Sequence, residues 1–164
     1  DGFVAKNLSP RQLVEEVKVF TDLEGVAKTY GQGSETGQIR SALVIDDSLF
    51  IRKLCRSVIT SRCNCRVLEA ANENLALELL RENPDIDLVI FDPAILSVNG
   101  KELINELAKL TDGCSIPVII CSVDGTDKVE TSQLSRDTER LAKPFTSKEL
   151  ATSIEKTLTR CVGK

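Results

Sequence analysis

An apolar run that ends in a carboxylate constrains the fold of this chain more than any other stretch. Residues 88–91 read Leu-Val-Ile-Phe, and Asp92 follows them directly. A strand that is buried on both faces of a parallel sheet has such a continuous apolar sequence. Open α/β sheets bind their ligands at the carboxyl ends of these strands. We therefore expect Asp92 to lie at the rim of a sheet, held rigidly and facing solvent.

Three other apolar runs also end in polar or charged groups, which are Asp46 with Asp47, Ser122 and Lys143. Each group alone has a structural interpretation, since an Asp after a strand often caps the next helix and Lys-Pro marks a turn. Four suitable groups at the ends of four strands are improbable by chance. We therefore expect these groups to meet around Asp92.

Strand and helix patterns alternate from residue 39 onward. The apolar runs predict strands at 41–45, 66–70, 87–91, 116–121 and 140–142. Apolar residues at three- and four-residue spacing predict helices at 50–59, 72–83, 103–107, 126–134 (weakly) and after a capping box at 146–149. This alternation predicts an α/β fold, a doubly wound five-stranded parallel sheet in the order 2-1-3-4-5 with helices on both faces.

A helical extension is predicted before this sheet. Apolar residues recur at helical spacing over residues 10–30, and a polar, Gly-rich linker follows at 30–38. We therefore divide the chain into an N-terminal amphipathic helix with its linker, 1–38, and a main domain, 39–164. The apolar stripe of the helix needs a covering surface. The candidates are the main domain, a second copy of the chain in a homodimer, and an upstream domain.

Composition excludes several classes of function. The chain contains no His, which excludes catalytic pairs and metal sites built on His and assigns any phosphohistidine to a partner molecule. The net charge of −4, with both signs interspersed, argues against nucleic acid as a partner. No apolar run is long enough to span a membrane and no secretory leader is visible. We expect no membrane contact and a cytoplasmic location.

The six cysteines are expected to be reduced. Cys55 and Cys121 lie in apolar stretches, as buried thiols of cytosolic proteins do. Cys63 and Cys65 form a C-x-C pair, which lacks the spacing of zinc and redox sites. We therefore assign no metal or disulfide to them.

The predicted rim contains the groups that phosphoryl transfer needs. Asp46, Asp47 and Asp92 would repel one another and raise each other's pKa unless a cation offsets their charge. Mg²⁺ is a hard cation that binds carboxylate oxygens. Lys143 offers a fixed positive charge and Ser122 a hydroxyl donor. Together these groups suit an attack of Asp92 on phosphorus, in which the other groups stabilise the phosphoryl oxygens.

Residues 39–161 resemble the receiver domain of response regulators in two-component signalling. The matching stretches are 43–48 (LVIDDS), 87–92 (DLVIFD) with Asn99-Gly100 after it, 116–122 (IPVIICS) and 141–146 (LAKPFT). Their order and spacing agree with the family over about three quarters of the chain. The resemblance implies the same doubly wound fold.

The resemblance also implies roles for individual residues. It makes Asp92 the acceptor of a phosphoryl group from a phosphohistidine on a sensor histidine kinase or a phosphotransfer protein. It assigns Mg²⁺ to Asp46, Asp47, the Asp92 carboxylate and the backbone carbonyl of Ala94. Ser122 would move to the phosphoryl group and Lys143 would pair with it. The peptide bond between Lys143 and Pro144 is expected to be cis.

Four positions depart from the family pattern. Pro93 directly after the phosphoacceptor is unusual, and Leu96 stands where most relatives have Pro. Val123 replaces the Ala or Gly that normally follows the switch hydroxyl, and Arg140 replaces an aromatic residue. We expect Val123 to crowd the phosphoryl site and to slow both phosphorylation and dephosphorylation.

The function predicted from these residues is a Mg²⁺-dependent signalling switch. The chain would catalyse only its own phosphorylation and dephosphorylation, so it is not expected to be an enzyme with a separate substrate. No DNA-binding segment follows the last predicted helix, so output through protein contacts is expected. The alternative is a pseudo-receiver that signals or dimerises without phosphorylation. A hydrolase with Asp92 as nucleophile is disfavoured, because Ala94 stands where a second carboxylate would be needed.

Overall fold

The described part of the chain forms one parallel sheet covered by helices. The computed structural model describes residues 39, 41–63, 65–96, 101–111, 116–123, 134 and 138–162. Its strands are β1 (Ser41–Ile45), β2 (Arg66–Ala70), β3 (Leu88–Phe91), β4 (Val118–Val123) and β5 (Glu139–Lys143). All neighbouring pairs are parallel and the order is β2-β1-β3-β4-β5, so the predicted sheet is confirmed.

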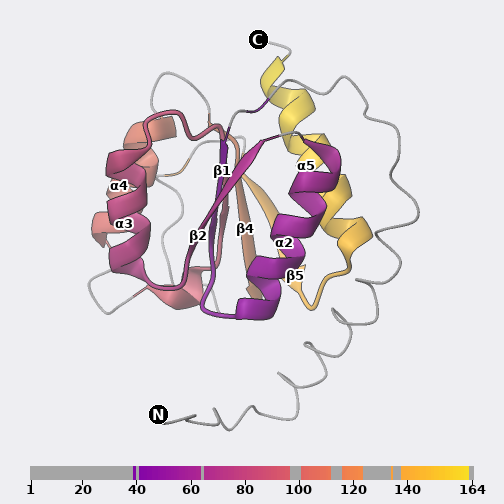
Figure 1. The fold of residues 1–164 in the computed structure, drawn as a ribbon, viewed down its shortest axis with the longest axis horizontal. Coiled ribbons are helices and arrows are strands. Elements are labelled where there is room, and N and C mark those ends of the chain that lie inside the picture. Colours follow the sequence, from indigo (N-terminus) through magenta and orange to yellow (C-terminus); the bar gives the residue numbers. More distant parts are fainter. Residues whose placement is uncertain are drawn as a thin grey trace, which may run out of the picture.

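Helices lie on both faces of this sheet, as predicted (Figure 1). One face carries α2 (Leu49–Arg62) and α5 (Ser147–Val162), and the other carries α3 (Glu73–Glu82) and α4 (Lys101–Thr111). A short 3₁₀ turn, η1 (Pro93–Ile95), follows β3. Because each helix buries one apolar stripe, the sheet separates two hydrophobic cores.

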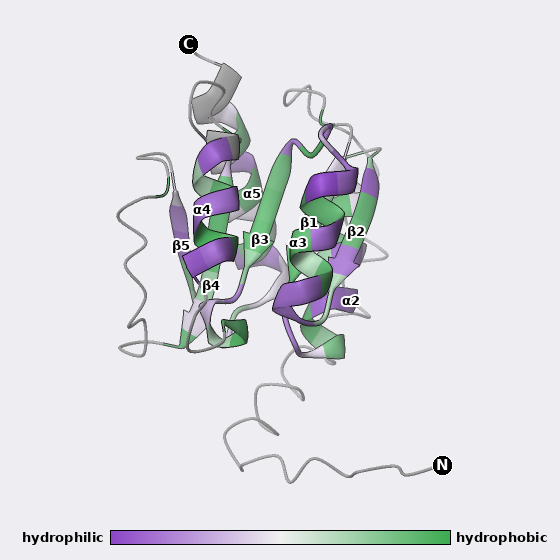
Figure 2. Ribbon diagram, turned by 90° about the vertical axis from the view of Figure 1, so that its left-hand side faces the viewer, coloured by the Kyte–Doolittle hydropathy of each residue, from purple (hydrophilic) through white to green (hydrophobic). Residues whose placement is uncertain are grey.

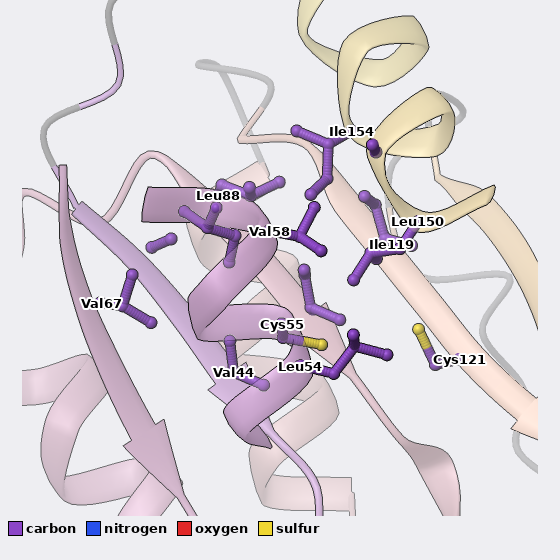
Figure 3. Close-up of a cluster of buried hydrophobic side chains, with 14 of the residues drawn as sticks. Val44, Leu54, Cys55, Val58, Val67, Leu88, Ile119, Cys121, Leu150 and Ile154 are labelled. Atoms are coloured by element: carbon purple, nitrogen blue, oxygen red, sulfur yellow. The ribbon is translucent and has the colours of Figure 1, made fainter. Parts of the chain in front are cut away.

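The first core lies between the sheet and the α2–α5 pair. Figure 3 shows Leu54, Cys55 and Val58 of α2 beside Ile119 of β4 and Ile154 of α5. The second core lies under α3 and α4, where Figure 2 shows the hydrophobic β3 behind helices whose outward surfaces are largely hydrophilic. The β3 residues 88–91 are buried throughout, because they contribute to both cores.

The helix ends follow the predicted caps. The Asn72 side chain accepts a hydrogen bond from the backbone N–H of Leu75, 2.9 Å away, and so begins α3. Asn83 ends this helix, as expected from the Asn-Pro pair. Before α5, Thr146 and Glu149 exchange the two hydrogen bonds of the predicted capping box.

The predicted boundaries of three strands were wrong by one to two residues. The third strand begins at Leu88, one residue later than predicted, and the fourth ends at Val123, two residues later than predicted. The fourth strand was expected to begin at 116, but β4 begins at Val118, because Pro117 has no N–H to donate to a ladder. The Pro117 carbonyl still accepts from the N–H of Val89 at 3.0 Å. The fifth strand is longer than predicted, since Glu139 and Lys143 also pair with β4.

Two predicted segments lie outside the described residues, namely the N-terminal helix and linker of 1–38 and the helix of 126–134 except Leu134, which is buried. Within the described ranges, no helix combines the length and the apolar character that crossing a bilayer requires.

Candidate functional site

The sheet register brings Asp46 and Asp92 to the same rim. Ile45 of β1 is paired with Phe91 of β3, and the two aspartates directly follow this pair. The backbone N–H of Asp92 donates to the carbonyl of Ile45 at 2.8 Å, which extends the ladder into the site. One carboxylate oxygen from each of Asp46, Asp47 and Asp92 lies within 4.8 Å of the others. The carboxylates that were predicted to converge are therefore close together.

The two members of the acidic pair have different surroundings. Asp46 is buried, and its Oδ1 accepts a hydrogen bond from the N–H of Ser48 at 2.8 Å, whereas Asp47 is exposed. Neither caps α2, because the N-cap is Ser48, whose Oγ accepts from the N–H of Ile51. The structural interpretation of the acidic pair as a helix cap is therefore wrong.

Lys143 lies between two carboxylates. Its Nζ is 2.7 Å from Oδ2 of Asp46 and 2.5 Å from Oδ2 of Asp92, and all three side chains are nearly buried. Burial raises the pKa of Asp46, and Lys143 only partly opposes this effect. Burial works against the charged form of Lys143, but Asp46 and Asp92 outweigh it, so the pKa of Lys143 is raised. The lysine is therefore a fixed cation.

The expectation that Asp92 faces solvent was wrong, since this residue is only 6% exposed. Lys143 contacts Oδ2 of Asp92, while Oδ1 accepts a hydrogen bond from the N–H of Ala94 at 2.8 Å. Pro93 begins the η1 turn after Asp92 and is buried. This turn keeps the backbone of Ala94 beside the Asp92 carboxylate.

Ser122 lies at the same end of the sheet. It is half-buried near the end of β4, in register with Ala142, the residue before Lys143. Val123 is the register partner of Lys143 and is 44% exposed. The peptide bond between Lys143 and Pro144 is cis, as the family resemblance implied. Arg140 is exposed on β5, and the predicted Asn99-Gly100 match lies outside the described residues.

The donor set fits a hard divalent cation. Three carboxylates can each present an oxygen to one ion, and Mg²⁺ prefers such ligands. The carboxylates of Asp46 and Asp92 have more lone pairs than the hydrogen bonds described above use, so contact with Lys143 does not exhaust their capacity. The exposure of Asp47 leaves an approach from solvent. Asp46, Asp47 and Asp92 are therefore the residues that could hold the ion.

The sequence interpretation missed Arg52 of α2. Its Nη1 donates to the backbone carbonyl oxygens of Asp46 and Asp47, at 2.7 and 3.1 Å. The only signal in the sequence is a cationic residue at the fourth position of the helix that follows the acidic pair. Arg52 follows Ile51, which belongs to the apolar stripe of this helix. A charged residue beside such a stripe is normally taken to face solvent, so the pattern does not predict the contact with the loop.

Comparisons with known proteins agree with this geometry. Residues 42–155 match the family model of the response regulator receiver domain. A chemotaxis protein CheY homolog of Campylobacter jejuni is 29% identical over 117 residues, which cover 71% of this chain and 90% of that protein. The two-component response regulator ORR5 of Oryza sativa is 27% identical over 128 residues, covering 78% of this chain and 92% of that protein.

A solved structure gives the same result. The receiver domain of the hybrid histidine kinase CckA is 28% identical, with a TM-score of 0.55, and the match covers 72% of this chain and 98% of that domain. Because the family model spans more than half of the chain and the fold and acidic rim agree with it, this chain belongs to the response regulator receiver domain family of two-component signalling.

Proposed function

We propose that Asp92 accepts a phosphoryl group from a phosphohistidine of a sensor histidine kinase or phosphotransfer protein, in a Mg²⁺-dependent reaction. One observation carries this proposal: Lys143 bridges the carboxylates of Asp46 and Asp92, and Asp47 lies within reach of both. A nucleophilic carboxylate beside a fixed cation and two further carboxylates is suited to phosphoryl transfer.

In this reaction a carboxylate oxygen of Asp92 forms a bond to phosphorus. The bond between phosphorus and the imidazole nitrogen of the donor breaks, and its electron pair returns to that nitrogen. Lys143 Nζ is already 2.5 Å from Asp92, so it can stabilise negative charge on the phosphoryl oxygens without a large rearrangement. Ser122 supplies a hydroxyl donor from β4.

The metal would be held by Asp46, Asp47, the Asp92 carboxylate and the backbone carbonyl of Ala94. When bound, Mg²⁺ supplies additional positive charge for the phosphoryl oxygens. Burial of Asp46 supports this assignment, because a buried carboxylate that faces another carboxylate is stabilised by a cation. The exposed carboxylate of Asp47 supports entry of the ion from solvent.

The signal would pass through protein contacts and not through nucleic acid or a membrane. The chain would be a switch that acts on no substrate besides its own Asp92, with the helix at 10–30 as a candidate for contact with a second copy or an upstream domain. The four described cysteines, Cys55, Cys63, Cys65 and Cys121, are free thiols, which supports a reducing compartment such as the cytoplasm.

Incubation with Mg²⁺ and acetyl phosphate, followed by intact-mass measurement, tests the proposal. The wild-type chain should gain one phosphoryl group, and Asp92→Asn should gain none. Asp85→Asn is the matched control, because Asp85 precedes β3, at the opposite end of the strands from Asp92, and pairs with Arg66 instead; it should behave as the wild type does. Excess EDTA should abolish the gain.

Two results would refute the proposal. A phosphoryl group that persists in Asp92→Asn would place the acceptor elsewhere. No gain in the wild-type chain, together with no Mg²⁺ binding in a calorimetric titration, would favour the phosphorylation-independent pseudo-receiver.

A further inference from the structure

The acidic loop between β1 and α2 is held from behind by an arginine. Nη1 of Arg52 donates to the carbonyl oxygens of both Asp46 and Asp47, at 2.7 and 3.1 Å. The Arg52 side chain is only 12% exposed. A nearly buried guanidinium that donates to two consecutive carbonyl oxygens fixes the orientation of the two peptide units that carry them. The reason is that each hydrogen bond requires its donor hydrogen to point at the acceptor oxygen.

Glu69 of β2 holds this arginine in place. Its Oε2 is 3.6 Å from Nε of Arg52, and its side chain is 16% exposed. Its other oxygen, Oε1, binds Nε of Arg56, one turn further along α2. Arg56 also donates through Nη2 to the carbonyl of Val67 on β2, at 3.1 Å. Glu69 therefore offsets two cations, of which only Arg52 contacts the acidic loop.

The contacts divide the loop into a backbone side and a carboxylate side. Arg52 binds the carbonyl oxygens of Asp46 and Asp47, while the N–H of Ser48 binds Oδ1 of Asp46 at 2.8 Å. Both carbonyl oxygens are bound to Arg52, while the Asp46 carboxylate contacts Lys143 and the carboxylates of Asp46 and Asp47 both lie within 4.8 Å of that of Asp92. The guanidinium also places positive charge close to a loop that carries two negative charges.

We propose that Arg52 is a positioning residue for cation binding: it orients the Asp46-Asp47 backbone so that both carboxylates are directed to one ion. This inference rests on the Mg²⁺-dependent function proposed above. Arg52 does not touch the ion or the phosphoryl group. It acts through the loop, as the outer partners of metal ligands do when they hold a ligand in its binding orientation.

Arg56 provides a matched control. Both arginines lie on α2, both contact Glu69, and both donate to a backbone carbonyl. Replacing either one removes a contact between α2 and β2, so both variants should lose some stability. A purely structural role of Arg52 would therefore give the same change in Mg²⁺ affinity for Arg52→Ala and Arg56→Ala.

The experiment compares the wild-type chain with Arg52→Ala, Arg52→Lys and Arg56→Ala. Calorimetric titration measures the Kd for Mg²⁺, and urea unfolding verifies that each variant is folded. We expect Arg52→Ala to weaken binding about tenfold or more. Arg52→Lys keeps the charge but lacks the planar fork, so its affinity should be intermediate. The Kd of Arg56→Ala should remain within about twofold of the wild-type value, since Arg56 contacts Val67 and Glu69 of β2 and not the acidic loop.

A second measurement needs no metal. In EDTA, amide hydrogen exchange of Ser48 reports how well the loop is fixed, because this N–H binds the Asp46 carboxylate. Its exchange should accelerate in Arg52→Ala more than in Arg56→Ala. Equal acceleration in the two variants would assign Arg52 a general structural role and overturn the proposal.

The two proposals fail in different ways. If the wild-type chain binds no Mg²⁺ and accepts no phosphoryl group, the proposed function fails and the positioning role fails with it. If the wild-type chain binds Mg²⁺ and Arg52→Ala binds it equally well, only the positioning role is refuted.

Discussion

Replacing Lys143 with Met should destabilise the metal-free fold by about 3 kcal/mol at neutral pH. The substitution removes the ammonium that binds Asp46 at 2.7 Å and Asp92 at 2.5 Å. Met has a similar length and fills the same space, so little packing is lost. What remains is a pair of nearly buried carboxylates, with side chains 3% and 8% exposed, facing each other without their common cation.

The magnitude follows from this burial. Removing one partner of a buried ion pair typically costs about 3–5 kcal/mol, because the remaining charge is left uncompensated. We take the lower end, since Asp46 keeps its hydrogen bond from Ser48 and Asp92 keeps its bond from Ala94, both at 2.8 Å. With a urea m-value of about 2 kcal/mol/M, the unfolding midpoint should fall by about 1.5 M.

The loss should depend on pH in a defined direction. Burial already raises the pKa of Asp46 above its usual 3.8, and Lys143 opposes this. Without Lys143 the native-state pKa of Asp46 rises further, so the native variant binds more protons than the unfolded chain at pH values above 3.8. Stability of the variant therefore falls as the pH rises through this window. The deficit relative to the wild type should be smaller at about pH 5.5 than at pH 7.

Urea unfolding followed by far-UV circular dichroism in EDTA measures the effect. Lys109→Met is the matched control, because Lys109 is 68% exposed and binds Glu106 at 2.8 Å within α4. An exposed pair of this kind contributes about 0.5 kcal/mol or less. A double variant, Lys143→Met with Asp46→Asn, should recover part of the lost stability. The electrostatic reasoning is refuted if Lys143→Met loses no more than the control, or if its deficit grows on acidification.

Two further predictions concern other residues of the described chain. Val123→Ala should shorten the lifetime of the phosphorylated chain about threefold, which is equivalent to about 0.65 kcal/mol in the barrier to dephosphorylation. The reason is that Val123 is paired with Lys143 in the sheet register and is larger than the residue that the family has at this position. An unchanged rate of phosphate release would contradict this prediction. Burial, followed by the charges of Cys63 and Asp87, raises the pKa of Cys65 to about 11. Its alkylation by iodoacetamide at about pH 8, measured by peptide mapping, should therefore be on the order of one hundredfold slower than that of a free thiol and should accelerate as the pH rises.

The sheet was predictable from sequence because its strands are buried on both faces. Continuous apolar runs such as 42–45 and 88–91 have few other structural explanations, and the alternation with helices leaves few topologies. The convergence of Asp46 and Asp92 then follows from the pairing of β1 with β3. The caps at Asn72 and Thr146 were also predictable, because they depend on residues only three positions apart.

The features that sequence reasoning missed depend on contacts between distant segments or on single backbone groups. Arg52 gains its role from carbonyl oxygens in the preceding loop and from Glu69 on β2, and no local spacing shows this. Burial of Asp92 also escaped prediction, since its surroundings include Lys143, which lies 51 residues away in the chain. The start of β4 was misplaced because an apolar pattern does not register the missing N–H of Pro117.

The proposed function needs carboxylates close together at the acidic rim, but their mutual repulsion lowers the stability of the fold. In the described structure, two cationic side chains offset this repulsion. Lys143 faces the carboxylates from β5, and Arg52 faces the backbone of the same loop from α2. Lys143 lies 97 residues after Asp46, so this compensation exists only once β5 is paired with β4. Before β5 pairs with β4, the Lys143 ammonium does not offset the repulsion between the carboxylates of Asp46 and Asp92. The last strand of the sheet therefore stabilises the loop after the first strand, and the charge balance of the site requires β1, β3, β4 and β5 to be paired.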